Sequence, residues 1–226
     1  MIPKINVKYD IISDANNRYK SLKNENSNWR KLVPTDAVER LKRIIKKWES
    51  CINELVKFIN EKYDSKYIDA NVLNIQSILE DHIEYIVKRL EELTESPFDY
   101  EEINVQCTTF PRCPYNWENW FFWTFVVTDK QELILRNSIH EMSHFQFHKY
   151  YENNWLVKDL NDNEKYILKE SLTFLVNTEF PELELAEDKW YPEHKTIREN
   201  MLKYRNKNKD KWFLELVNYW CKLIKQ

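Results

Sequence analysis

Apolar residues recur at helical spacing along two long stretches in the first half of the chain. Within residues 35–59, and again within residues 69–93, isoleucine, leucine and valine return every three or four positions. This is the pattern of a helix that buries one face. Thr35 is a suitable capping residue for the first helix. We therefore predict two long helices that pack as an antiparallel hairpin, with core packing as the role of both stripes.

Shorter apolar segments predict a small β-sheet. Residues 4–12 and 103–109 alternate between apolar and polar positions, and residues 120–127 are apolar on both faces, as in a strand that is covered on both sides. Residues 111–116 contain prolines and predict a turn, so the last two segments are expected to pair as a hairpin. The polar residues 13–28 predict a loop or a short irregular helix.

Helical patterns return in the second half of the chain. One covers about residues 128–151, directly after the predicted hairpin, and another covers residues 163–180, where Pro181 ends it. An acidic loop follows. Two further helices are then expected at about residues 193–204 and 210–224.

These elements together predict an α+β fold that is dominated by helices and carries a small sheet before the helix at 128–151. No repeat, low-complexity tract or clear linker divides the chain, so we expect a single domain over residues 1–226. Its parts would be an N-terminal strand and helical hairpin (1–96), the sheet and the central helices (97–180), and the C-terminal helices (181–226).

The first central helix contains His140-Glu141-Met142-Ser143-His144, an HExxH sequence. Residues four apart lie on the same face of a helix, so both imidazoles can reach one metal ion while Glu141 stands beside them. A zinc ion held by two imidazoles and a third ligand keeps a position open for water and lowers its pKa to about 7. Glu141 can then accept the proton as the general base. The alternative is a pair of incidental histidines on a core helix.

The third ligand is expected on the following helix, where Glu170 falls within a stripe of apolar residues. A charged residue in such a stripe is costly unless it is paired or bound to a metal. The ordinary alternative is a glutamate at the edge of the stripe that reaches solvent. His194, which follows the acidic loop and could fold back over the site, is an alternative ligand.

With His140, Glu141, His144 and Glu170, the chain resembles the gluzincin class of zinc metallopeptidases over about residues 120–177. The resemblance implies a zincin-like domain, a Zn²⁺ cofactor held by the two histidines and Glu170, and a peptide or protein substrate. It also implies that an edge strand of the small sheet pairs with the extended substrate.

The chain departs from the best-known gluzincins in two ways. More residues separate His144 from Glu170 than in thermolysin-like enzymes, so the connecting loop must be longer. Those enzymes also place an aspartate four residues after the ligand glutamate, where it orients a zinc histidine; this chain has Phe174 at that position. The orientation of the histidines must then come from other residues.

Peptide hydrolysis also needs a donor that stabilises the developing oxyanion. Tyr191, His194 and Tyr166 are the candidates. The leading prediction is thus a zinc-dependent hydrolase of the metallopeptidase class, with Glu141 as general base. The alternatives are a catalytically inactive protein of the same fold that binds a partner or acts as a scaffold, and a metallopeptidase associated with nucleic acid.

Charge and hydropathy narrow the range of partners. A net charge of -3 and a pI near 6.0 provide no basic surface of the kind that nucleic-acid binding needs, so no nucleic-acid partner is expected. The N-terminus lacks an apolar signal core, and the longest apolar run, residues 120–127, is too short to span a bilayer. We therefore expect a cytoplasmic protein with no membrane partner; the oligomeric state is not predicted.

Cysteine and glycine usage are both informative. The four cysteines form no Cys-x-x-Cys pair, and without an export signal we expect them to be reduced and packed rather than metal-bound. The chain contains no glycine at all, although average usage predicts about 7%. Trp155 follows Asn153-Asn154 and Trp190 follows Asp188-Lys189, both at sites where turn chemistry would favour glycine.

Overall fold

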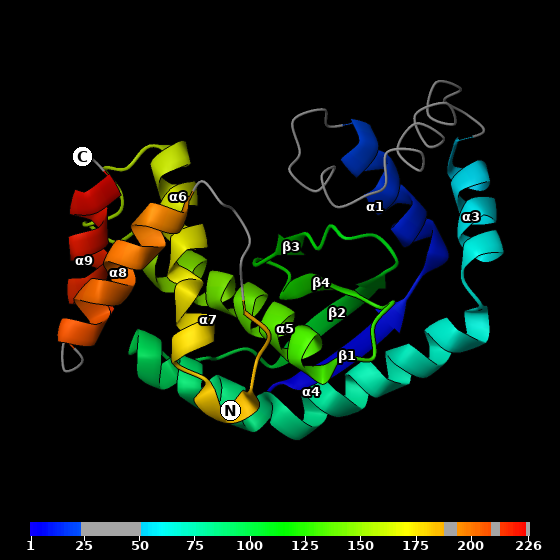
Figure 1. Cartoon of the computed structure of the whole chain (residues 1–226), viewed down its shortest axis with the longest axis horizontal. Helices are drawn as coiled ribbons and strands as arrows, with labels where there is room; N and C mark the ends of the chain where they lie inside the picture. Colours follow the sequence, from blue (N-terminus) through cyan, green and yellow to red (C-terminus); the bar gives the residue numbers. More distant parts are fainter. Residues whose placement is uncertain (24–50, 188–193, 209–212, 225–226) are drawn as a thin grey trace. The chain divides into compact units, whose positions relative to one another are not determined.

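The computed structural model describes residues 1–23, 51–187, 194–208 and 213–224. These residues confirm the predicted α+β fold, dominated by helices with a small four-stranded sheet (Figure 1). They group into two compact units. One, here called the sheet unit, comprises residues 4–80 and 102–134, and the other, the helical unit, comprises residues 1–3, 81–101 and 135–226.

The strands of the sheet unit are β1 (Lys4–Tyr9), β2 (Glu102–Thr108), β3 (Tyr115–Asn116) and β4 (Phe121–Phe125). They are arranged in the order β1-β2-β4-β3. β1 and β4 both pair in parallel with β2, with Val105 opposite Val7 on one side and Phe122 on the other. The apolar residues of β2 are buried, as expected for a central strand.

The predicted hairpin between β2 and β4 is therefore wrong. The segment 109–120 is about a dozen residues long, which is enough for the crossover that a parallel pair needs. Within this crossover lies β3, which pairs antiparallel with β4 through Tyr115 opposite Phe122 and Asn116 opposite Phe121. The strands were predicted at nearly the right residues, but residues 109–120 cross over instead of turning back, so β2 and β4 are parallel.

Two helical predictions for the sheet unit are also corrected. The segment predicted as a loop or irregular helix contains α1 (Ile11–Lys23), a regular helix. The described end of the first predicted long helix is α3 (Cys51–Lys62), which packs on α1 rather than back along α4 (Ser65–Thr94) (Figure 1). The rest of that predicted helix lies outside the described residues. Cys51, Leu55 and Ile59 of α3 form a buried cluster with Ala15 and Phe110.

A buried polar network joins α1 to the C-terminal end of β2. Asp14 is fully buried, and its carboxylate accepts hydrogen bonds from the hydroxyl of Thr108 at 2.5 Å and from the backbone N–H of Thr109 at 3.2 Å. Arg18, one turn later on α1, donates to the carbonyl oxygen of Thr109 at 2.7 Å. Asp14 and Arg18 thus form hydrogen bonds with the C-terminal end of β2. Buried charged and polar groups need such partners.

The outer edge of β1 is occupied by a side chain of α4. Gln76 accepts a hydrogen bond from the backbone N–H of Val7 at 2.8 Å, and its amide nitrogen donates to the carbonyl oxygen of Ile5 at 2.8 Å. The amide group therefore bonds the strand much as a neighbouring strand would.

The helical unit contains most of the remaining helices. They are α5 (Gln131–Gln146), whose first turn belongs to the sheet unit, followed by the π-helix η2 (Phe147–Tyr151), α6 (Asp162–Leu172), α7 (Phe174–Thr178), the 3₁₀ turn η3 (Pro181–Leu183), α8 (Lys195–Lys207) and α9 (Phe213–Ile224). Trp220 is fully buried in their core and makes edge-to-face contacts with Phe174 and Phe213. The two C-terminal helices were predicted correctly. The helix predicted at 163–180 is instead divided at Thr173 into α6 and α7.

Three residues take a left-handed backbone in place of glycine. Among the described residues, Glu95, Trp120 and Glu184 have φ angles of 51°, 52° and 45°. The left-handed region costs a residue with a Cβ atom about 1–2 kcal/mol. Glu95 follows the last residue of α4, where helices most often place a glycine.

The cysteines were expected from the sequence to be reduced and packed. All four cysteines are free thiols, and Cys51, Cys107 and Cys221 are buried. Burial, with the nearby Asp14 carboxylate, raises the pKa of Cys107 to about 12.

Among the helices that the structure describes, none is both long enough and apolar enough to cross a bilayer.

Candidate metal centre

Helix α5 places two histidine side chains on one face. The rings of His140 and His144 meet edge to face, with centroids 4.6 Å apart. His144 is almost completely buried, whereas the His140 side chain is 14% exposed. One imidazole is thus held firmly in the interior and the other borders solvent.

Helix α6 brings the third side chain. Its N-terminus is fixed by a capping box, in which the Asn161 side chain accepts from the backbone N–H of Glu164 at 3.0 Å and the Glu164 carboxylate accepts from the backbone N–H of Asn161 at 2.8 Å. Leu168 and Leu172 then pack into the core of the helical unit. Glu170, between these two, is buried and lies beside the two histidines.

The ligand atoms of His140, His144 and Glu170 all lie within 4.8 Å of one another. The Nε2 atom of His140 is 3.6 Å from Oε2 of Glu170, and the Nε2 atom of His144 is 3.5 Å from Oε1. Two ligands about 2.0 Å from a shared tetrahedral zinc ion lie roughly 3.3 Å from each other. The distances between the imidazoles and the carboxylate are close to this value.

The donor set and its surroundings also fit a metal ion. Two imidazoles and one carboxylate are a zinc ligand set that leaves a fourth position open. The Oε2 atom of Glu170 is buried and has no hydrogen-bond partner among the described residues. A buried carboxylate oxygen in this state is unusual, and a cation between the three side chains would satisfy it.

The protonation states favour metal binding. Burial lowers the pKa of His144 to about 3, and the nearby charge of Lys169 acts in the same direction. The imidazole is therefore neutral near pH 7, as a metal ligand must be. Burial acts to raise the pKa of Glu170, but the imidazoles of His144 and His140 and the ammonium of Lys169 together hold that pKa below its usual range. Glu170 is thus ionised.

Three of the four predicted catalytic residues, Glu141, Tyr166 and His194, lie within the described part of the chain. Glu141 follows His140 on α5 and is 7% exposed. His194 is buried just before α8, and its ring meets that of Tyr166 edge to face at 5.8 Å. Tyr166 lies one turn before Glu170 on α6, so His194 reaches the helix that carries the third ligand. Tyr191 lies outside the described residues.

Among the described residues, the group of potential metal ligands contains His140, His144 and Glu170 and does not include His194. It does not include His148 either, although this residue continues the spacing of the two histidines on α5. His148 instead contacts the Glu152 carboxylate, with 2.8 Å between Nδ1 and Oε2, where the chain has passed from α5 into the π-helix η2.

One charged neighbour of the site was not singled out from the sequence. The ammonium of Lys169 lies 2.8 Å from Oε1 of Glu170, and both side chains are buried. Adjacent residues on a helix normally point in different directions, so no spacing rule connects this lysine to the metal site. Its long flexible side chain allows the contact.

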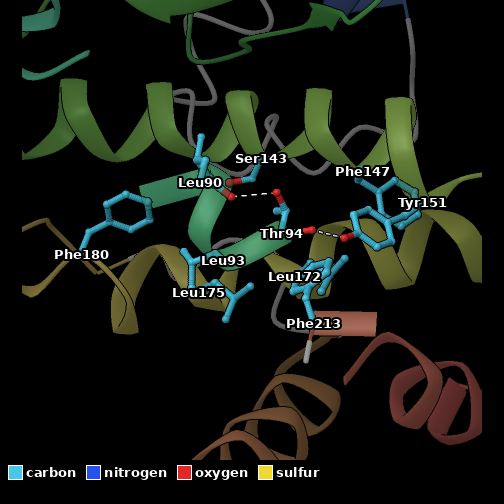
Figure 2. Close-up of a pocket in the computed structure, with 10 residues that line it drawn as sticks. All are labelled: Leu90, Leu93, Thr94, Ser143, Phe147, Tyr151, Leu172, Leu175, Phe180 and Phe213. Carbon is cyan, nitrogen blue, oxygen red and sulfur yellow. Dashed lines mark hydrogen bonds between the residues drawn. The ribbon is translucent and has the colours of Figure 1, made fainter. Parts of the chain in front are cut away.

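A small cavity lies beside the same helix, lined by residues of α4, α5, η2, α6, α7 and α9 together with Phe180 (Figure 2). Ser143, the residue before His144, is one of its lining residues. The lining is mostly apolar, and the cavity volume is about 20 Å³, room for about one water molecule. This cavity is therefore too small for a peptide and is a packing feature of the core.

No protein-family model, curated protein or solved structure matches the chain. The function of this chain is therefore inferred from the geometry of His140, His144 and Glu170.

Proposed function

We propose that this chain is a zinc-dependent hydrolase of the metallopeptidase class. The observation that carries the proposal is the convergence of His140, His144 and Glu170, two of them from an HExxH sequence and the third from a separate helix. His144 and Glu170 are buried, and a buried charged group is rare unless it is paired or coordinates a metal. The buried position of this group supports a metal centre rather than a chance encounter.

Each side chain has a definite task in this proposal. His140 and His144 would hold the ion as neutral imidazoles, and Glu170 would contribute the negative charge that balances it. Zinc, when bound, supplies a Lewis acid that polarises the scissile carbonyl and acidifies a water molecule. Glu141 would act as the general base, which would accept a proton from water and deliver it to the leaving amine. His194 and Tyr166 are the described candidates for a hydrogen-bond donor to the oxyanion.

A second candidate is a protein of this kind that binds metal and a partner without turnover. Phe174 occupies the position where thermolysin-like enzymes carry an orienting aspartate, and it is buried in the core of the helical unit. No carboxylate can therefore orient a histidine from that position. This candidate predicts zinc binding without hydrolysis.

Metal content and hydrolysis measured together test both candidates. We expect about one zinc per chain by mass spectrometry and cleavage of a mixed peptide library by the zinc-loaded protein. Glu141→Gln should retain zinc and lose at least about a hundredfold in rate, the lower range for removal of a general base. A wild-type protein that takes up no divalent metal would refute both candidates, and zinc without any cleavage would favour the second.

A further inference from the structure

Among the described residues, Lys169 forms a salt bridge with one of the candidate metal ligands. Its ammonium lies 2.8 Å from Oε1 of Glu170, and the two side chains are 10% and 5% exposed. The ring of Tyr166 lies 5.5 Å from the same ammonium and forms a cation–π contact. The lysine is thus held within the site by both a carboxylate and an aromatic face.

The two oxygens of Glu170 have different surroundings. Oε1 contacts both Lys169 and His144, whereas Oε2 faces His140 at 3.6 Å and has no hydrogen-bond partner among the described residues. Lys169 therefore holds one oxygen and leaves the other for a metal ion. The lysine contact does not need to break when the ion binds.

Charge compensation explains why a lysine would be useful here. A buried carboxylate without a cation is strongly destabilising. Two positive groups can offset that cost at Glu170, the ammonium or a divalent ion. When both are present they repel each other at short range, where the screening by water is weak.

We infer that Lys169 is a built-in counter-cation of the metal site, which stabilises the Glu170 carboxylate in the metal-free protein and weakens metal binding by charge repulsion. The inference rests on the proposed function in one respect, that this site binds a divalent cation. It implies that the helical unit folds with its ligands already in place, unlike small zinc domains that fold only when metal binds.

The linkage between stability and binding makes this role measurable. If a substitution destabilises the metal-free state but not the metal-bound state, metal affinity must rise by the corresponding factor. Lys169→Met should therefore lower the melting temperature without zinc, leave it close to wild type with saturating zinc, and tighten the zinc Kd about tenfold or more. A residue that served packing alone would lower both melting temperatures and leave the Kd unchanged.

Three matched variants complete the experiment. Lys165→Met removes the same charge one turn earlier on α6 and should change neither quantity. Lys169→Arg keeps the charge and should keep the wild-type zinc affinity. Lys169→Gln keeps a polar group but removes the charge, and it should change the melting temperatures and the zinc Kd in the same directions as Lys169→Met. It provides the measurement if Lys169→Met folds only when zinc is present.

The outcomes separate the inference from the proposed function. Zinc titration uses a competing chelator, so that affinity is measured without any assay of activity. Equal destabilisation of both states, or weaker zinc binding in Lys169→Met, would overturn the counter-cation role while leaving the metal site intact. If the wild-type protein binds no divalent cation in the same titration, the proposed function fails, and the inference fails with it.

Discussion

The Nε2 atom of His144 and the Oε1 atom of Glu170 lie 3.5 Å apart, although they belong to different helices. The contact depends on how α5 and α6 pack, because neither helix alone contains the ligand set. It also places a neutral imidazole against a buried carboxylate. A substitution at the site should therefore change the zinc affinity and the free energy of unfolding by different amounts.

Removal of His144 should eliminate the metal site. His144→Ala takes away a ligand that is 2% exposed and leaves a void in a packed interior. We expect loss of stoichiometric zinc and loss of the stabilisation that zinc gives to the wild-type protein. Zinc content and melting temperature with and without zinc check this. His148→Ala is the matched control on the same run of helix, and a comparable loss of zinc in that variant would contradict the assigned ligand set.

Glu170→Gln tests the third ligand. The amide keeps the shape of the side chain but not the charge that balances the ion, so zinc affinity should fall. His194→Ala should leave zinc affinity close to wild type, because His194 is outside the group of potential ligands among the described residues. Parallel zinc titrations of the two variants show whether Glu170 or His194 is the third ligand. A large loss in His194→Ala with no change in Glu170→Gln would reverse the assignment.

Asp14 should contribute far more to stability than Asp10, the surface aspartate that directly precedes the same helix. Asp14→Ala removes the acceptor for Thr108 and Thr109 and leaves Arg18 buried near an empty position. Breaking such a buried charged network costs about 3–5 kcal/mol. Asp10 is exposed and accepts from the backbone N–H of Ser13 at 2.6 Å at the start of α1. Asp10→Ala should cost about 1 kcal/mol, the usual value for a lost cap.

Urea unfolding of both variants measures this difference. The free energies of unfolding should be compared at equal slope, so that a change in the unfolded state is not mistaken for lost contacts. Similar costs at Asp10 and Asp14 would mean that the buried network contributes little.

Glycine should stabilise the chain where the backbone is left-handed. Glu184 is exposed and has a φ angle of 45°, so Glu184→Gly relieves the steric cost of the Cβ atom and should stabilise by up to about 1 kcal/mol. Glu118 is also exposed but is not among the positive-φ residues. Glu118→Gly should be neutral or destabilising, because it only adds freedom to the unfolded chain. Thermal unfolding distinguishes the two, and a gain at both positions would reject the explanation from backbone strain.

The sequence predicted those features that depend on local periodicity. The apolar stripe of α4 marked its extent to within a few residues, and the spacing of His140 and His144 placed both rings on one face. Glu170 was found because a charged residue interrupted an apolar stripe. These signals are strong because burial of one helical face repeats with the helix itself.

The remaining features depend on contacts between distant residues. The parallel pairing of β2 with β4 depends on the crossover of residues 109–120, and the strand β3 within it is too short to produce an alternating pattern. The polar segment around Asp14 predicted a loop or a short irregular helix, because its buried partners, Thr108 and Thr109, lie far away in sequence. Lys169 was overlooked for a related reason, since only its flexible side chain brings it to the neighbouring carboxylate.

The contact of Gln76 with β1 has a consequence for self-association. β1 is an edge strand of the described sheet, and an edge with unpaired backbone groups is a template on which another chain can add a strand. The Gln76 amide already occupies the N–H of Val7 and the carbonyl of Ile5. An incoming strand would have to displace a side chain anchored on α4 before it could pair, so this helix protects the sheet against edge-to-edge aggregation.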